Sequence, residues 1–232
     1  MRSKSLLVLL FAAFATAHIV ISYPGWRGNN LITNDTFPYG MQWMYPCGGI
    51  GTTTNRTYWP TTGGAVAFQP GWFRGHERAN IQINLGYGTD GPDHGPVDMS
   101  NQMLPVLQLL GPSNGPYPGT VCFPQVPMPK DANVSVGDKA TIQVVEQAQH
   151  GAALFSCVDI EFAAPGDPKI EKVTEENCFN STDLGFAEIY AIATTNPVTG
   201  KSYDDVKNDA VSTRSSLSLI STVVAAGLWA LL

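Results

Sequence analysis

An alternation of polar and apolar residues runs through residues 80–85. A period of two sends alternate side chains to opposite faces of a β-strand, so this segment predicts a strand with one buried face, ending in a turn at residues 86–88. Patterns of the same kind predict strands at residues 18–23, 65–68, 140–146 and 154–162. No segment has a convincing helical period over three turns.

The strand expected at residues 154–162 is long enough to divide into two faces. One face carries Leu154, Val158, Ile160 and Phe162, and the other carries Phe155, Cys157, Asp159 and Glu161. Short strands of this kind, separated by turns that draw on 23 glycines and 17 prolines, predict an all-β fold. We expect a β-sandwich with Greek-key connections and long loops.

The N-terminus has the order of a secretory signal. Residues 1–17 begin with Arg2 and Lys4, continue with an apolar stretch and end in Ala15-Thr16-Ala17. Signal peptidase cleaves after small residues in this arrangement, so cleavage after Ala17 is expected to leave His18 as the first residue.

The C-terminus has the order of a glycosylphosphatidylinositol (GPI) attachment signal. Small residues at 208–210 precede a polar spacer, and residues 217–232 are uncharged. We expect a signal peptide at 1–17, a domain at 18–193, a polar stalk at 194–208 and a GPI propeptide at 209–232, with Asn208 as the attachment residue. A tail anchor and a merely hydrophobic C-terminus are the alternatives.

Secretion predicts roles for the cysteines and the asparagine sequons. Four cysteines in an oxidising compartment predict two disulfides, for which the sequence allows three pairings. We favour Cys47 with Cys157 and Cys122 with Cys178, because the first bridge would hold the loop before His76 near the last strand. The four Asn-x-Ser/Thr sequons predict glycosylated surface positions at Asn34, Asn55, Asn133 and Asn180.

The charge balance excludes nucleic acid as a partner. The chain has 13 Lys and Arg against 19 Asp and Glu, a net charge of −6, and no basic run. Binding to a phosphate backbone requires clustered basic side chains. An anionic polymer is an equally poor partner.

Histidine is the most informative residue type for chemistry, because the chain has only four. After cleavage, His18 would offer a free amine and an imidazole from one residue. Together with a second imidazole they supply three nitrogens in a T, which suits the tetragonal preference of Cu(II) better than the tetrahedral preference of zinc. The candidates for the second imidazole are His76, just before the alternating strand, and His94 and His150, in expected turns.

A set of short motifs, taken in order, resembles a known family. They are Tyr23-Pro24, Arg27-Gly28, Pro46-Cys47-Gly48-Gly49, Asn55-Arg56-Thr57, Gly75-His76 ahead of residues 81–86, Cys122, and Leu154-Phe155-Ser156-Cys157-Val158-Asp159-Ile160. With His18 after the signal, this order is similar to the fungal copper proteins related to lytic polysaccharide monooxygenases, of the copper acquisition factor type. The resemblance covers residues 17–162 and extends to the stalk and the GPI tail.

The resemblance implies an immunoglobulin-like, fibronectin-like sandwich with one copper ion held by a histidine brace of His18 and His76. It also implies an aspartate ligand, which we assign to Asp159, with Asp98 and Asp93 as reserves. His150 is a candidate for orienting a ligand or a copper-bound water. The sequence departs from the family in two places, since Glu77 follows His76 where proline is common and Phe155 stands where an aromatic hydroxyl is frequent.

Three functions follow from these observations. The first is a monomeric, extracellular, GPI-anchored protein of the plasma membrane or cell wall that binds copper in uptake or homeostasis as a carrier or sensor. A membrane copper transporter is its candidate partner. The resemblance favours such a binding protein over an enzyme. The second is a copper-dependent polysaccharide monooxygenase, which needs an aromatic platform that would come from Trp26, Trp43, Trp59 and Trp72. The third is a structural cell-wall protein without metal.

Overall fold

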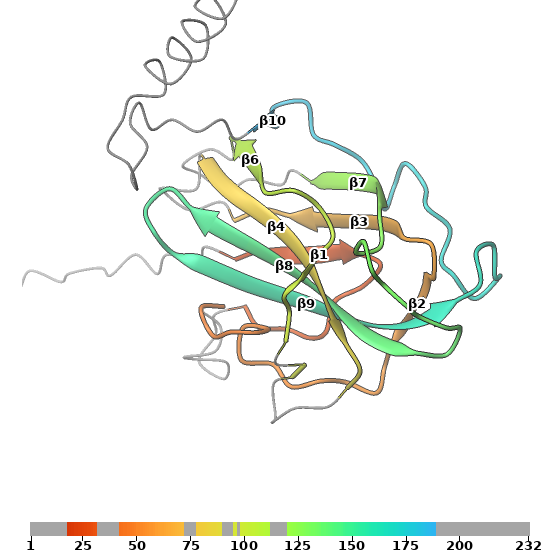
Figure 1. The fold of residues 1–232 in the computed structure, drawn as a ribbon. Coiled ribbons are helices and arrows are strands. Elements are labelled where there is room, and N and C mark those ends of the chain that lie inside the picture. Colours follow the sequence, from red (N-terminus) through yellow and green to blue (C-terminus); the bar gives the residue numbers. More distant parts are fainter. Residues whose placement is uncertain are drawn as a thin grey trace, which may run out of the picture. The chain divides into compact units, whose positions relative to one another are not determined.

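The computed structural model describes residues 18–31, 42–71, 78–89, 95–96, 98–111 and 120–188. The predicted signal peptide, stalk and GPI propeptide lie outside these ranges, as do His76, His94, Asp93, Trp72, Asn34 and Asn208. In the described ranges the regular structure consists of β-strands, without a helix (Figure 1). Accordingly, no helix in this part of the chain has the length and apolar character needed to cross a bilayer.

The strands form two sheets, which confirms the predicted all-β sandwich. The smaller sheet has the order β1-β3-β7, and the larger has the order β10-β6-β4-β8-β9-β2, with β5 paired to β4. In Figure 1 the long strands β4, β8 and β9 lie in front of β1 and β3. The bounds are β1 Val20–Tyr23, β2 Thr57–Pro60, β3 Gly64–Gln69, β4 Arg78–Tyr87, β5 Asn101–Gln102, β6 Leu107–Leu110, β7 Val121–Val126, β8 Lys139–Ala148, β9 Ala153–Ala163 and β10 Gly185–Glu188.

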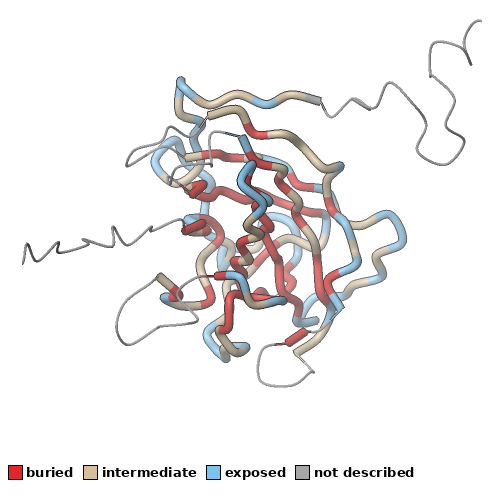
Figure 2. The backbone as a smooth tube through the Cα atoms, turned by 90° about the vertical axis from the view of Figure 1, so that its left-hand side faces the viewer, coloured by how far each residue is buried: buried red, intermediate tan, exposed pale blue. Residues whose placement is uncertain are grey.

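The core lies between the two sheets and is filled from the apolar faces that the alternation predicts. Ile81, Ile83 and Leu85 of β4 are buried with Leu154, Val158, Ile160 and Phe162 of β9. Side chains from β1 and β3 fill the same core from the smaller sheet, and Figure 2 shows the buried backbone positions running through the middle of the fold. Burial of these faces, at roughly 25 cal/mol per Å² of apolar surface, is the main force holding the sheets together.

Some predicted boundaries are displaced, and the strand expected from residue 18 begins at Val20. The turn expected at residues 86–88 begins only at Gly88, because Gly86 and Tyr87 still pair with Thr141 and Ala140 of β8. Gly88 has a φ of 77°, a left-handed conformation that favours glycine. A Cβ at position 86 would come within 2.6 Å of the Met99 sulfur, so this position requires glycine. The glycine interrupts the alternation of polar and apolar side chains along β4.

Five strands were not predicted, namely β2, β5, β6, β7 and β10. Four of them are only two or four residues long, too short for a period to stand out. The fifth, β7, contains Pro124, which cannot donate to a ladder and argues against a central strand. It is tolerated because β7 is an edge strand that pairs only with β3.

The disulfides have the pairing that the sequence analysis favoured. Cys47 is bonded to Cys157 and Cys122 to Cys178. The first bridge ties the loop at residues 42–53 to the outward face of β9. Such a bridge in a small secreted domain typically contributes about 2 to 5 kcal/mol to stability. Of the predicted glycosylation positions, the three that are described, Asn55, Asn133 and Asn180, are all exposed.

Candidate metal centre

Residue 19, directly after His18, is held by an unusual pair of hydrogen bonds. The Ile19 N–H donates to Gln42 Oε1 at 2.7 Å, and Gln42 Nε2 donates to the Ile19 carbonyl at 2.9 Å. Gln42 Nε2 also donates to Asn30 Oδ1 at 2.6 Å. The Gln42 side chain is fully buried, so these bonds form away from competing water. The backbone next to His18 is therefore fixed rather than frayed.

Gln42 is itself fixed by the strand that carries Phe155. The Phe155 N–H donates to the Gln42 carbonyl at 2.8 Å, and Gln42 has a φ of 57°. Gly48 packs against this cluster, because a Cβ at that position would overlap the Asn30 side chain and come within 2.7 Å of the Phe155 carbonyl. The N-terminal segment, the loop and β9 are thus joined at one point, five residues from the Cys47 bridge along the loop.

His18 lies at the end of the smaller sheet and is buried, with 2% of its surface exposed. Val20 pairs with Gln69 in the antiparallel β1–β3 ladder, and Ile21 pairs with Phe68. The ladder ends at the Val20–Gln69 pair, so His18 and Gly71 each lie two residues beyond the same end of it.

Gly71 marks the start of the segment that carries His76. Residues 72–77 lie outside the described ranges, but both ends of the segment are placed. The Gly71 N–H donates to Glu146 Oε2 at 2.9 Å, and the Arg78 carbonyl accepts from the Gln149 N–H at 2.9 Å. Both anchors therefore lie at the end of the sandwich where β1 begins.

Glu146 is a functional candidate that the sequence analysis missed. It is fully buried on β8, where it pairs with Ile81 of β4 and Leu154 of β9. It shares the core face of β8 with Ile142 and Val144, so its carboxylate lies between the sheets. The signal was available, because Glu146 continues the period-two series of apolar residues at 142 and 144.

Asp159, the predicted third ligand, lies elsewhere. Asp159 on β9 is the register partner of Thr141 on β8. Thr141 is five residues from Glu146 along β8, which is about 17 Å at the strand rise of ~3.4 Å per residue. The alternation correctly predicts that Asp159 faces away from the core, but loops cover that face and the residue is buried.

Both oxygens of the Asp159 carboxylate have protein partners. Oδ1 accepts from Arg27 Nη2 at 2.7 Å and from the Thr141 hydroxyl at 2.6 Å, and Oδ2 accepts from the Thr53 N–H at 2.8 Å. Burial lowers the pKa of Arg27, while the charge of Asp159 and its hydrogen bond oppose that shift. Arg27 also donates to the carbonyls of Ile50 and Gly95. Asp159 and Arg27 together join the loops that carry Arg27, Thr53 and Gly95 to the larger sheet.

The other predicted residues in the described part do not gather around His18. Asp98 is exposed beside Gly86, at the opposite end of β4 from Arg78, and a hydrogen bond from Ser100 holds its pKa below the ordinary value. His150 is exposed in the β8–β9 turn, where its Nδ1 accepts from the Ala152 N–H at 3.3 Å.

The four tryptophans do not form one platform. Trp59 is fully buried in the core, and Trp26 packs against the core and donates to the Ser156 hydroxyl. Trp43 is exposed, and Trp72 is outside the described ranges. Within those ranges, no group of three or more His, Cys, Asp and Glu side chains is arranged to hold a metal ion.

The donors at the His18 end still suit copper. Gln42 holds the backbone beside residue 18, whose imidazole and, after the expected cleavage, amine are nitrogen donors. The segment that carries His76 starts at the same end of the smaller sheet. Nitrogen donors of this kind are the ligands that Cu(II) prefers, and a buried carboxylate nearby favours a cation.

Comparison with known proteins agrees with this chemistry. A family model described as copper acquisition factor BIM1-like matches residues 16–183. The lytic polysaccharide monooxygenase-like protein X325 of Hypocrea jecorina is 71% identical over 197 residues, 85% of each chain. The lytic polysaccharide monooxygenase-like protein ham-7 of Neurospora crassa is 62% identical over 192 residues, 83% of this chain and 84% of the relative. The chain therefore belongs to the BIM1-like family of copper acquisition factors.

Proposed function

We propose that this protein binds one copper ion at the cell surface through a histidine brace on an immunoglobulin-like sandwich and takes part in copper uptake or homeostasis. The amine and imidazole of His18 and the imidazole of His76 are the proposed ligands. The observation that carries the proposal is the clasp of Gln42 on Ile19, which fixes the backbone beside His18 at the end where the His76 segment begins.

The clasp matters because chelation by one residue depends on its backbone. The amine and the imidazole of residue 18 must both point at the same ion, and a frayed terminus would lose conformational entropy on binding. Because residue 19 is already held at both its N–H and its carbonyl in the folded protein, less conformational entropy is lost when copper binds. Outer partners of this kind tune metal affinity by orienting the ligands.

Glu146 supports the proposal electrostatically. Its carboxylate accepts from Gly71, which, like His18, lies two residues beyond the same end of the β1–β3 ladder. A buried negative charge near this position favours a divalent cation. We leave Asp159 out of the ligand set because Arg27, Thr141 and Thr53 already use both its oxygens.

The proposed location is extracellular, with a signal peptide removed after Ala17 and a GPI anchor attached near Asn208. Family membership and two disulfides are consistent with a secreted protein. An acidic surface would raise the local concentration of cations, and a membrane copper transporter is the natural recipient of the ion.

A second candidate function comes from the relatives, whose names describe them as lytic polysaccharide monooxygenase-like. Copper-dependent oxidation of a polysaccharide would use the same brace. The core positions of Trp59 and Trp26 weaken it, because they remove half of the aromatic platform that such an enzyme would need. Release of oxidised products from a polysaccharide supplied with copper and a reductant would establish this alternative.

Copper(II) titration followed by electron paramagnetic resonance (EPR) tests the proposed function. Protein processed to His18 should bind one equivalent with a spectrum of three nitrogen ligands. His76→Ala should weaken binding strongly, whereas His94→Ala should not. Loss of binding in His94→Ala alone would identify His94 as the second imidazole ligand in place of His76. Absence of copper binding by every form would favour the alternative of a structural cell-wall protein without metal.

A further inference from the structure

Three carboxamide side chains lie next to one another on adjacent strands of the larger sheet. Asn80 on β4 is the register partner of Gln108 on β6 and of Gln147 on β8. Directly opposite residues share a face, and neighbouring strands are about 4.8 Å apart. The residues beside them in sequence are buried, including Ala79, Leu109 and Ala148, so the three carboxamides face away from the core.

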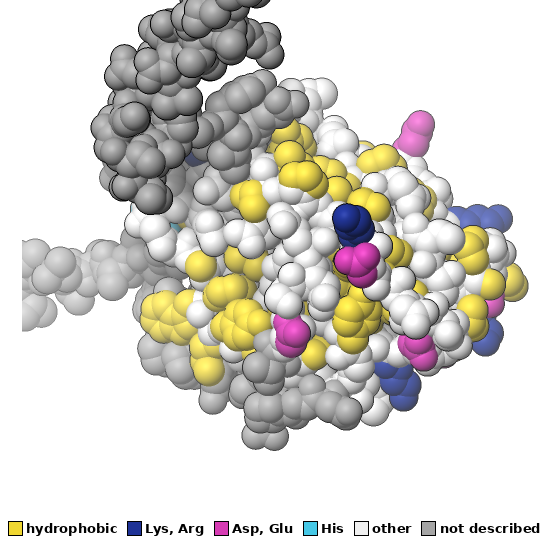
Figure 3. Space-filling view, in the orientation of Figure 1, with side chains coloured by type: hydrophobic (Ala, Val, Ile, Leu, Met, Phe, Trp, Pro, Cys, Tyr) yellow, Lys and Arg dark blue, Asp and Glu magenta, His cyan; other side chains and the backbone are white. Residues whose placement is uncertain are grey.

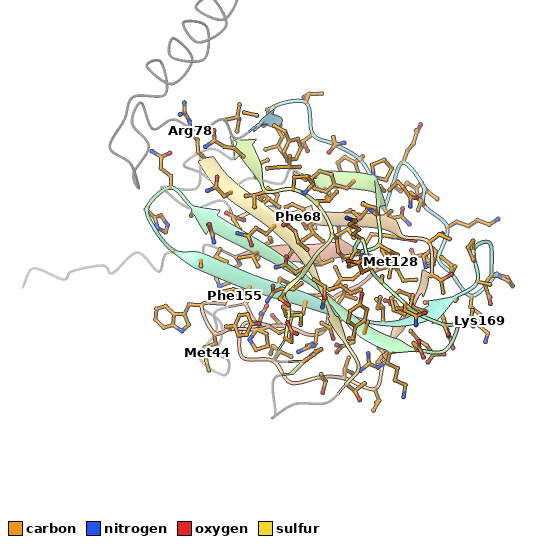
Figure 4. The ribbon with its side chains drawn as sticks, in the orientation of Figure 1. Met44, Phe68, Arg78, Met128, Phe155 and Lys169 are labelled. Carbon is orange, nitrogen blue, oxygen red and sulfur yellow. A yellow bond between two sulfur atoms is a disulfide. The ribbon has the colours of Figure 1, made fainter. Side chains whose placement is uncertain are left out.

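These side chains line a pocket of about 610 Å³, called here the carboxamide pocket. Gln149, Gly151 and Ala153 line it at the β8–β9 turn, and among the described residues of the lining Arg78 is the one that carries a charge. Figure 4 shows Arg78 at the start of β4. The described part of the lining is thus polar and carries a single positive charge, in a chain with a net charge of −6.

The carboxamides of the pocket differ from a matched pair further along the same strands. Asn84 and Gln143 are also opposite each other on β4 and β8, and Asn84 Nδ2 donates to Gln143 Oε1 at 2.9 Å. Asn80 and Gln147 occupy equivalent facing positions, yet their side chains form no hydrogen bond with any other described residue. Their donors and acceptors therefore remain available to a ligand.

Such a lining recognises a particular chemistry. A carboxamide both donates and accepts hydrogen bonds, as a sugar hydroxyl does. A polyanion would need several cations, and the residues that the structure describes in the lining supply one, Arg78. A protein partner would need an apolar centre, and the apolar side chains in the described part of the lining are alanines. A chain of uncharged sugars fits best.

Aromatic side chains continue the surface beside the pocket. Phe155 follows Ala153 by two residues on the outward face of β9, and the Tyr45 ring packs edge-on against it at 5.7 Å between centroids. Tyr45 and Trp43 are 50% and 54% exposed. Hydrophobic side chains gather at the lower left of Figure 3, where Figure 4 places Met44 and Phe155. Aromatic rings offer flat faces on which the C–H faces of sugar rings pack.

We propose that the carboxamide pocket binds a segment of an uncharged polysaccharide, whose chain extends over Phe155, Tyr45 and Trp43. The side-chain amides of Asn80, Gln108 and Gln147 hydrogen-bond sugar hydroxyls, and Arg78 donates to a further oxygen. This binding needs no copper and would hold the protein against a glycan matrix, a role separate from the proposed function.

Nuclear magnetic resonance tests the proposal without assuming which sugar is bound. Copper-free protein is titrated separately with soluble β-1,3-glucan, mannan and chitohexaose, and with polygalacturonate as the charged comparison. At least one uncharged glycan should shift the side-chain NH₂ signals of Asn80, Gln108 and Gln147 and leave those of Asn84 and Gln143 in place. No shift with any uncharged glycan, or shifts with polygalacturonate alone, would overturn it.

Substitutions separate a binding role from a folding role. The double variant Asn80→Ala, Gln147→Ala should weaken glycan binding by about tenfold, since it removes at least two hydrogen bonds, and should keep the wild-type melting temperature. Asn84→Ala is the matched control on the same strand and should bind as the wild type does. Equal binding by the double variant, or concentration-dependent self-association that the double variant abolishes, would refute a glycan site.

Discussion

Gln42 closes two hydrogen bonds on one residue, Ile19, accepting from its N–H at 2.7 Å and donating to its carbonyl at 2.9 Å. The Gln42 side chain thus gives Ile19 the two backbone hydrogen bonds that a neighbouring strand would give it in a sheet. It continues the pairing of β1 past the end of the β1–β3 ladder at Val20, where the chain approaches the predicted cleavage site. The residue that supplies the proposed copper amine is thereby attached to the folded core.

Removing this clasp should weaken copper binding as well as the fold. Gln42→Ala leaves the N–H and the carbonyl of Ile19 without these partners, which costs about 1 to 3 kcal/mol for each buried group left unsatisfied. Because Gln42 then no longer holds the backbone beside His18, copper(II) affinity should fall by about 10- to 100-fold. Isothermal titration calorimetry measures the affinity, and thermal denaturation measures the stability.

Gln143→Ala is the matched control. Gln143 is a buried glutamine with side-chain hydrogen bonds to Pro46 and Asn84, on the outward face of β8. It should lose similar stability but keep the wild-type copper affinity. If both variants lose affinity in proportion to stability, Gln42 has no specific role at the metal.

Asp159→Asn should distinguish a structural role of Asp159 in its ion pair with Arg27 from a role as a copper ligand. The substitution breaks the buried contact with Arg27, which typically costs about 3 to 5 kcal/mol. We expect a lower melting temperature and an unchanged EPR spectrum of bound copper. A changed spectrum at constant pH would return Asp159 to the ligand set.

Glu146→Gln should weaken copper binding while the fold survives. Glutamine still accepts the hydrogen bond from the Gly71 N–H, but the negative charge is lost. A several-fold lower copper(II) affinity, with wild-type stability, is the expected outcome of calorimetry. Unaltered affinity would mean that the charge of Glu146 has no role in copper binding and that its role is structural.

Copper affinity should fall steeply as the pH drops from about 8 to 5. An α-amino group has a reference pKa of about 7.7 to 8.0 and an imidazole one of about 6.5, and both must lose a proton before they bind. Below these pKa values protons compete with copper, so the affinity decreases as the pH falls. A flat profile over this range would indicate carboxylate ligands, which stay ionised throughout.

The sequence predicted the parts of the fold that repeat at short range. The period of two in β4 and β9 assigned their faces correctly, including the outward position of Asp159. It could not reveal that the segments carrying Arg27 and Thr53 cover that face, because those segments lie more than 100 residues away along the chain. The alternation therefore gave the direction of Asp159 but not its partners.

The contacts that define the proposed site could not be predicted from the sequence for the same reason. Gln42 is 23 residues from Ile19 in a segment without regular structure, so no pattern pointed to it. Glu146 was visible as a charge in an apolar series, but a single acid at the end of a predicted strand is equally consistent with a solvated strand end. Only the register of β4, β8 and β9 places it inside the sandwich.

The most direct test of the account compares two forms of the protein that differ only at the N-terminus, one starting at His18 and one with a single extra residue before it. Copper(II) affinity and the EPR spectrum are measured for both, with thermal denaturation to establish that both fold. The form starting at His18 should bind one copper with three nitrogens, and the extended form should bind about 100-fold more weakly with a changed spectrum. Equal affinities and identical spectra would contradict the brace.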